Sequence, residues 1–171
     1  MNMQTTDHPV TFQPDAENTR LLRDAFGRFA TGVTIVTTQS EDGPVGITAN
    51  SFSSVSLDPP LVLWAPDKGS RRFRYFEQAE HYAIHVLCNE QSALCHGFAK
   101  DAHAFDGLDL TRNEEGVPLI GSCLARFECQ RVAAYEGGDH LIVLGRVLRA
   151  EMREGDALTF FAGKIGQIAP K

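Results

Sequence analysis

The sequence has few cysteines, no long apolar run and no excess of basic residues, and each shortage excludes a class of protein. Its four cysteines form no CxxC pair, so we expect free, packed thiols in a reducing compartment. No apolar run approaches the roughly 20 residues that cross a bilayer, and the first residues lack the parts of a secretory signal. A net charge of −6 argues against a general nucleic-acid binder. We therefore expect a cytoplasmic protein that binds neither nucleic acid nor membrane.

The glycine-rich loops of common nucleotide-binding folds are also missing. Neither GxGxxG nor GxxxxGK[ST] occurs, so a Rossmann or P-loop site has no support. Histidines and cysteines lack the paired spacing of a zinc site, and we expect no bound metal. What remains is an ordinary globular composition, 43% hydrophobic and 22% charged, with a length that fits one domain.

Hydrophobic spacing divides the chain into an arm and one β-rich domain. Residues 1–17 are polar and patternless, which predicts a flexible N-terminal arm, and residues 18–171 form the domain. Helical spacing follows Asn18 as far as Phe29 and recurs in two short segments, 67–78 and 89–100. Alternating or wholly apolar runs predict strands at 32–38, 44–52, 61–65, 81–88, 125–136, 140–152 and 157–168. Many strands and few helices favour an antiparallel β-barrel with peripheral α-helices over a doubly wound sheet.

The most unusual stretch runs from Gly46 to Pro60 and reads GITANSFSSVSLDPP. Small residues let a ligand approach the backbone, whose free N–H and C=O groups can bond the edge of a heteroaromatic ring. The hydroxyls can bond a polyol. The alternative is a polar loop ended by two prolines, and composition alone favours that interpretation.

Two further segments carry groups that bind anions or titrate. The run from Lys68 to Arg72 concentrates cations where a helix is expected to begin, which suits an anion. Taken alone, it is more simply a solvated helix start. The turn Gly137-Gly-Asp-His140 exposes an imidazole that titrates near neutral pH, although a simple hairpin turn explains it equally well. Together, the stretch from Gly46 and the cationic run could hold a ring, its polyol and a terminal phosphate.

Four blocks give the sequence a family resemblance: RFATGVTIVTT (28–38), GITANSFSSVSLDPPLVL (46–63), KGSRRF (68–73) and YEGGDHLIVLGRV (135–147). In this order and separation they resemble the short-chain flavin reductases, the reductase components of two-component flavin-dependent monooxygenases. The resemblance runs from about residue 20 to 168. It implies an FMN-binding split β-barrel, mainly β and antiparallel, that works as a homodimer.

The resemblance also implies site residues, position by position. The residues expected to line the flavin ring and its ribityl chain are Thr48, Ala49, Asn50 and Ser51. Those expected to border the ring edge are Ser54, Val55 and Ser56. Those that fit the flavin phosphate are Lys68, Ser70 and Arg71. The turn that the family associates with the nicotinamide nucleotide is Gly138, Asp139 and His140. Where the family often has a basic Ser-Arg-Arg-Phe-Ala-like run, this chain has Leu94-Cys-His-Gly-Phe-Ala99, which leaves Phe98 as a residue that could stack on a ring.

The implied activity is that of an NAD(P)H:flavin oxidoreductase, which reduces FMN or FAD by hydride transfer and supplies a partner monooxygenase. The flavin carries the redox chemistry, and the protein supplies placement. His140 is the catalytic candidate because it would orient the nicotinamide or its ribose. NADH is slightly favoured over NADPH, since no basic cluster for a 2′-phosphate is evident. The alternatives are a flavin carrier that accepts no hydride and a pyridoxamine-phosphate-oxidase-like flavoenzyme, and the Gly-Asp-His turn favours the reductase.

Overall fold

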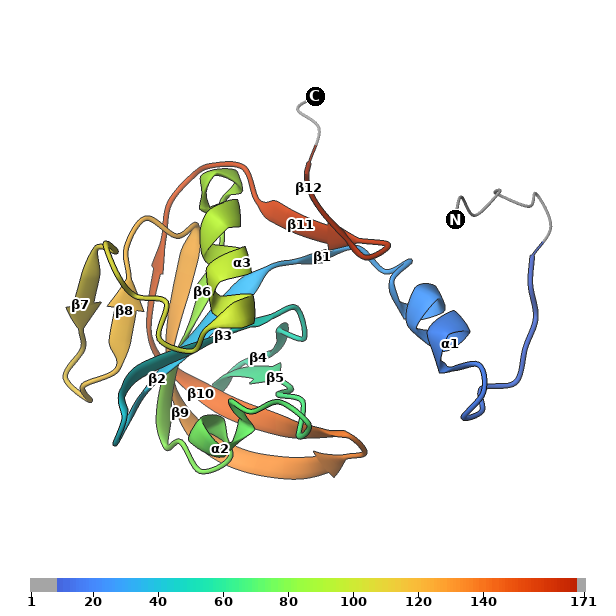
Figure 1. The fold of residues 1–171 in the computed structure, drawn as a ribbon. Helices are drawn as coiled ribbons and strands as arrows, with labels where there is room; N and C mark the ends of the chain where they lie inside the picture. Colours follow the sequence, from blue (N-terminus) through green and yellow to red (C-terminus); the bar gives the residue numbers. More distant parts are fainter. Residues whose placement is uncertain (1–8, 169–171) are drawn as a thin grey trace.

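Strands are the main secondary structure of the computed structural model, which describes residues 9–168 (Figure 1). Every strand pair in that range is antiparallel, which confirms the mainly β, antiparallel class expected from the sequence. Part of the expected arm, residues 1–8, lies outside the described residues, and residues 9–18 contain neither helix nor strand. No helix in the described range is long and apolar enough to span a membrane.

Seven strands form the main sheet, in the order β3-β2-β6-β9-β10-β5-β4. Their bounds are β2 Thr34–Ser40, β3 Gly43–Ala49, β4 Ser53–Leu57, β5 Pro60–Trp64, β6 His81–Val86, β9 Ala125–Gly137 and β10 His140–Met152. Strands β3 and β4 lie at the two ends of this order, and no pairing between them is found among the described strands. Six of the seven strand segments predicted from the sequence lie in this sheet, the seventh (157–168) lies outside it, and β4 had not been predicted as a strand.

Two small sheets and four helical segments flank the main sheet (Figure 1). The small sheets consist of β1 Thr31–Gly32 with β11 Leu158–Phe161 and β12 Lys164–Gln167, and of β7 Leu110–Arg112 with β8 Pro118–Ile120. The helical segments are α1 Thr19–Phe26, α2 Phe73–Phe76, the 3-10 turn η1 Asn89–Gln91 and α3 Ser92–Lys100. The short strands β7 and β8 lie outside the segments for which the sequence predicted strands.

The prediction of a helix over residues 67–78 is wrong for the first half of that range. Only the four residues of α2 are helical, because Asp67 forms an isolated antiparallel bridge with His140 instead. A backbone that pairs with a strand is extended and cannot enter a helix at the same place. The helical segment expected over residues 89–100 is confirmed, as the 3-10 turn η1 followed by α3.

Strand β2 is buried on both faces and separates two hydrophobic clusters. Successive side chains of a strand point to opposite faces. Val36 therefore packs with Trp64 and Tyr82 in one cluster, while Ile35 packs with Phe98 in the other. The second cluster lies under α3, which packs on β3 and β2 (Figure 1).

A fully buried histidine joins the main sheet to β8. His85 on β6 is 0% exposed. Its Nδ1 lies 3.1 Å from the carbonyl oxygen of Ile35, and the backbone N–H of Ile120 donates to Nε2 at 3.1 Å. Because a carbonyl only accepts, the imidazole is neutral with its proton on Nδ1. Burial lowers the pKa of His85 to about 4, so both bonds persist at neutral pH.

We predict that His85 makes the fold sensitive to acid. An unfolded histidine takes up a proton below about pH 6.5, while the folded one resists protonation until about pH 4. The contribution of His85 is therefore complete above pH 6.5 and is lost as pH falls towards 4, at up to about 1.4 kcal/mol per pH unit. Urea unfolding at several pH values measures this slope. His85→Asn should flatten it, whereas the control His96→Asn, at an exposed position, should keep it. Equal slopes in His85→Asn and the wild type would contradict the assignment.

Candidate functional site

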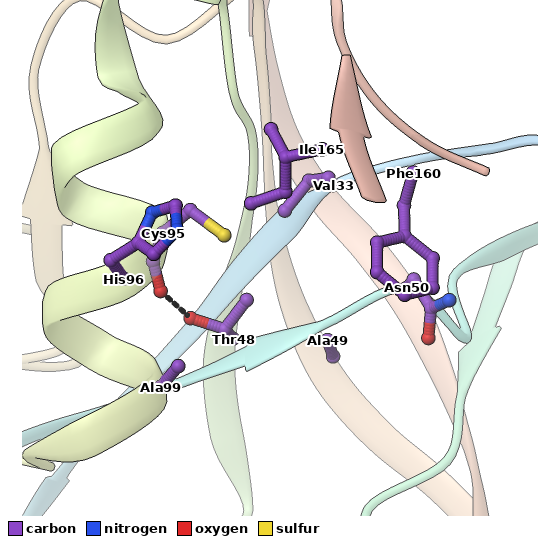
Figure 2. Close-up of a pocket in the computed structure, with 9 residues that line it drawn as sticks. All are labelled: Val33, Thr48, Ala49, Asn50, Cys95, His96, Ala99, Phe160 and Ile165. Carbon is purple, nitrogen blue, oxygen red and sulfur yellow. Dashed lines mark hydrogen bonds between the residues drawn. The ribbon is translucent and has the colours of Figure 1, made fainter. Parts of the chain in front are cut away.

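A cavity of about 280 Å³ opens beside the end of β3, between α3 and the β11–β12 hairpin (Figure 2). The residues that line it are Val33, Thr48, Ala49, Asn50, Cys95, His96, Ala99, Phe160 and Ile165. Most of these side chains are apolar, and the polar ones are spread around the cavity, with His96 on α3 and with Thr48 and Asn50 at and just after the end of β3 (Figure 2). Ligand pockets typically have this composition and span roughly 300–1,000 Å³. The cavity therefore suits a flat, largely apolar ring that meets a few polar groups at its edges, and it is too small to enclose a whole dinucleotide.

Three residues of the predicted ring-binding segment line this cavity: Thr48, Ala49 and Asn50. The hydroxyl of Thr48 donates to the carbonyl oxygen of Cys95 at 2.7 Å (Figure 2), which ties the end of β3 to α3. Asn50 is exposed, and no hydrogen-bond partner for its amide is found among the described residues. Its amide can donate and accept at once, so Asn50 offers the free polar group that a heteroaromatic edge requires.

Ser51 and the serines of β4 are placed differently. The Ser51 hydroxyl donates to the carbonyl oxygen of Ala65 at 3.0 Å and accepts from the Ala65 N–H at 2.9 Å. Ser51 therefore fastens the loop after β3 to the end of β5 and does not line the cavity. The three residues expected at the ring edge, which also do not line the cavity, lie on the end strand β4 and are Ser54, Val55 and Ser56.

Phe98 was predicted to stack on a ligand ring, but the structure buries it in the core. Its ring is 0% exposed and meets Phe105 edge to face, with the ring centroids 4.8 Å apart. A Cβ added at Gly46 would lie 2.6 Å from the Phe98 ring, so this ring fills the space above β3. The expectation that Phe98 stacks on a ligand ring is corrected, because a ring packed on all sides has no open face.

The cationic run divides into two places. The Lys68 ammonium pairs with the Glu136 carboxylate and donates to the Gly138 carbonyl oxygen at 2.8 Å, so it is held at the β9–β10 turn. Arg71 is exposed instead on a separate groove of about 280 Å³. The basic residues of this groove are Arg71, Arg72, Arg74 and Lys100. We expected Lys68 and Arg71 to bind one phosphate together, but the structure places them at two separate sites.

The hydroxyl of Ser70 accepts from the backbone N–H of Arg72 at 3.3 Å, and Arg72 donates to the Ala99 carbonyl oxygen at 3.0 Å. These bonds connect the start of α2 to the end of α3. The groove consequently lies along the same helix whose other residues line the cavity. Four cations along one groove attract an anion.

The turn between β9 and β10 presents His140. Gly138 has φ +75°, a conformation that glycine adopts freely in two-residue hairpin turns. The His140 side chain is 42% exposed, and its Nδ1 lies 2.8 Å from Oδ1 of Asp139. The hydrogen bond with His140 lowers the pKa of the Asp139 carboxyl. An ionised carboxylate only accepts, so Nδ1 carries a proton and Nε2 of the neutral ring is left as an acceptor.

Sequence reasoning missed most of the cavity lining. The missed residues are Val33, Cys95, His96, Ala99, Phe160 and Ile165. They come from three separate parts of the chain, and the local sequence of each part is that of an ordinary strand or helix with no sign of a binding site. The segment around Cys95 was noted only because it lacks the basic run that the family often has, and the run containing Phe160 and Ile165 was noted only as a strand segment.

Comparisons with known proteins agree with this geometry. The family model for the flavin reductase like domain matches residues 26–169. The FMN reductase (NADH) SmoA of Agrobacterium fabrum is 53% identical over 158 residues, which cover 92% of this chain and 91% of the relative. The reductase subunit HsaB of a flavin-dependent monooxygenase from Rhodococcus jostii is 38% identical, over 91% of this chain and 81% of HsaB.

A solved structure extends the likeness to three dimensions. The NADH:FAD oxidoreductase SgcE6 of Streptomyces globisporus superposes with a TM-score of 0.87 at 37% identity, covering 95% of this chain and 99% of SgcE6. SgcE6 has also been solved in complex with NAD and FAD fragments. The family resemblance carried by the four sequence blocks is thereby confirmed, and the chain belongs to the family of flavin reductase-like domains.

Proposed function

We propose that this protein is an NADH-dependent flavin reductase, which reduces FMN or FAD and supplies the reduced flavin to a partner monooxygenase. The observation that carries the proposal is the cavity lined by Thr48, Ala49 and Asn50, in a chain 53% identical to an NADH-dependent FMN reductase. Relatives named as monooxygenase reductase components support the oxygenase partner. These names favour a reductase over the flavin carrier and over the pyridoxamine-phosphate-oxidase-like enzyme.

The residues present fit a flavin. The ring system is flat and largely apolar with polar edges, which matches the mostly apolar lining and its few polar groups, and the flavin supplies the hydride-accepting chemistry when it is bound. Val33, Phe160 and Ile165 keep water from the apolar side, and the Asn50 amide meets the polar edge. Thr48 keeps that edge in place through its bond to α3. Because hydride transfer requires positioning, no side-chain acid or base is assigned, and His140 orients the nicotinamide or its ribose.

The flavin phosphate is proposed to lie in the basic groove, held by Arg71 with Ser70 beside it. Arg71 is the exposed cation of the run, whereas the Lys68 ammonium is already bonded to Glu136 and Gly138. A guanidinium that forks onto a phosphate makes strong, charge-assisted bonds. The adenylate of FAD would then extend from the groove towards solvent.

We further propose that the sheet is a split barrel and that the cytoplasmic protein is a homodimer. The two end strands, β3 and β4, are joined by only three residues, 50–52, which keeps the sheet edges near each other.

Helix α1 stands apart from the sheet (Figure 1), and its apolar residues are uncovered, Phe26 being 69% exposed. A second copy of the chain would cover this face. Four free, buried cysteines agree with a reducing compartment.

The test of the function is NADH oxidation by the purified protein with FMN, FAD or riboflavin added. We expect flavin-dependent oxidation of NADH, with bleaching of the flavin absorbance when oxygen is absent. His140→Ala should lower kcat/KM for NADH while flavin affinity, measured by fluorescence, stays the same. Flavin binding without oxidation of NADH or NADPH would contradict the proposal and support the carrier.

The phosphate assignment predicts a difference between two flavins. Arg71→Ala removes a charge-assisted bond to phosphate, a loss of roughly 1.5–3 kcal/mol, so the Kd for FMN should rise about tenfold or more. Riboflavin has no phosphate, and its affinity should stay the same. Arg74→Ala is the matched control, since this guanidinium lies on the same groove but is bonded to Tyr75 and Asp42; its effect on FMN should be smaller. Equal weakening of both flavins by Arg71→Ala would show the phosphate assignment to be wrong.

The dimer predicts a mass of two chains in sedimentation velocity at micromolar protein. Phe26→Asp introduces a charge into the uncovered face of α1 and should shift the protein towards one chain. Met152→Asp, which changes an equally apolar and exposed residue outside α1, is the control and should leave the mass unchanged. A wild type that sediments as a single chain would contradict the homodimer.

A further inference from the structure

The segment from Pro66 to Lys68 lies alongside the turn that carries His140. The carbonyl oxygen of Pro66 accepts from the Leu141 N–H at 3.1 Å, and the Lys68 N–H donates to the Asp139 carbonyl oxygen at 2.9 Å. Between these two bonds, Asp67 forms its bridge with His140. The backbone of the segment thus holds one side of the Gly-Asp-His turn, at the residue that carries the imidazole.

The Lys68 side chain holds the other side of the same turn. Its ammonium pairs with Glu136 on β9 and donates to the carbonyl oxygen of Gly138 within the turn at 2.8 Å. The Lys68 side chain is 30% exposed, whereas that of Glu136 is 81% exposed, so the bond to the Gly138 carbonyl oxygen is the better shielded of the two. One ammonium therefore connects the last residues of β9 to the turn itself.

The turn needs such a restraint because of its composition. Gly137 and Gly138 are adjacent, and glycine loses more conformational freedom on ordering than any other residue. Next to them, the Asp139 side chain is 89% exposed and finds its described partner only in His140. Without Lys68, the pair Asp139–His140 would be held through the backbone alone, by the ladder pair His140–Gly137 and by the bonds to residues 66–68.

We propose that Lys68 is a positioning residue for hydride transfer, which fixes the Gly138–Asp139–His140 turn and thereby the His140 imidazole. This inference rests on the proposed function, in which His140 contacts the nicotinamide nucleotide. It replaces the expectation that Lys68 binds the flavin phosphate, because both described bonds of its ammonium go to the hairpin. The Asp139 carboxyl, whose pKa is lowered by the His140 hydrogen bond and to a smaller extent by the Lys68 charge, is consistent with the arrangement.

The kinetic test compares Lys68→Met with Lys68→Arg. The methionine variant keeps an unbranched chain but removes two charge-assisted bonds, and kcat/KM for NADH should fall roughly tenfold. The Kd values of FMN and riboflavin should both stay within twofold of the wild type. Lys68→Arg keeps a donor and a charge and should recover most of the activity. Glu136→Gln, which leaves the bond to Gly138, should have a smaller effect than Lys68→Met.

A double-mutant cycle shows whether Lys68 acts through His140. In a His140→Ala background, Lys68→Met should cause no further loss of kcat/KM for NADH, since the group that it positions is absent. A full tenfold loss in that background would overturn the proposal. So would a Lys68→Met variant that weakens FMN but not riboflavin, because that result identifies a phosphate ligand.

Amide hydrogen exchange separates this proposal from the proposed function. In Lys68→Met the amide of Leu141, which donates to Pro66, should exchange at least several-fold faster than in the wild type, and in Lys68→Arg close to the wild-type rate. If the wild type oxidised no NADH, the proposed function would fail, and with it the role in hydride transfer, while faster exchange would still support the positioning of the turn. Unchanged exchange in Lys68→Met would overturn the positioning role whatever the activity.

Discussion

The packing of Phe98 against Gly46 is the contact on which the candidate site depends. A side chain at position 46 would place its Cβ 2.6 Å from the ring, so the glycine permits α3 to lie directly on β3. The backbone N–H of Gly46 also donates to the carbonyl oxygen of Ala102, just beyond α3, at 2.8 Å. This seating brings Thr48 within a hydrogen bond of Cys95. The cavity is the space that remains between this helix and the β11–β12 hairpin (Figure 2).

The hairpin β9–β10 provides a second rigid support. Its strands are the two longest of the structure's described part, 13 residues each, and both pair with further strands of the main sheet. Sites built on such elements hold their groups more accurately than sites built on free loops. The turn of this hairpin contains two adjacent glycines, which favour backbone mobility. The segment that includes Lys68 is bonded to the turn and restrains it. The two candidate binding regions therefore have separate supports, α3 for the cavity and Lys68 for the turn.

The sequence predicted the segment that lines the cavity better than it predicted individual contacts. Thr48, Ala49 and Asn50 were nominated from a motif and do line the cavity. Phe98 was nominated as an aromatic residue near the site, but local sequence does not distinguish a core ring from a stacking ring. Lys68 was grouped with Arg71 because the two are three residues apart. The bridge between Asp67 and His140 separates them, and this pairing joins residues more than 70 positions apart.

The sequence by itself determined the antiparallel β class, most of the strand segments and the family, because alternation of side chains and short motifs are local properties; the strands β4, β7 and β8 were not predicted. Only the tertiary structure decided which groups are free to act. The hydroxyls of Thr48 and Ser51 are engaged with backbone carbonyls, and the Lys68 ammonium is engaged with the hairpin. Asn50, Arg71 and His140 remain at the surface of the molecule. A polar group can bind a ligand only where the fold leaves it with unused hydrogen-bonding capacity. Whether a group is already bonded depends on residues that are distant in the sequence and close in the folded chain.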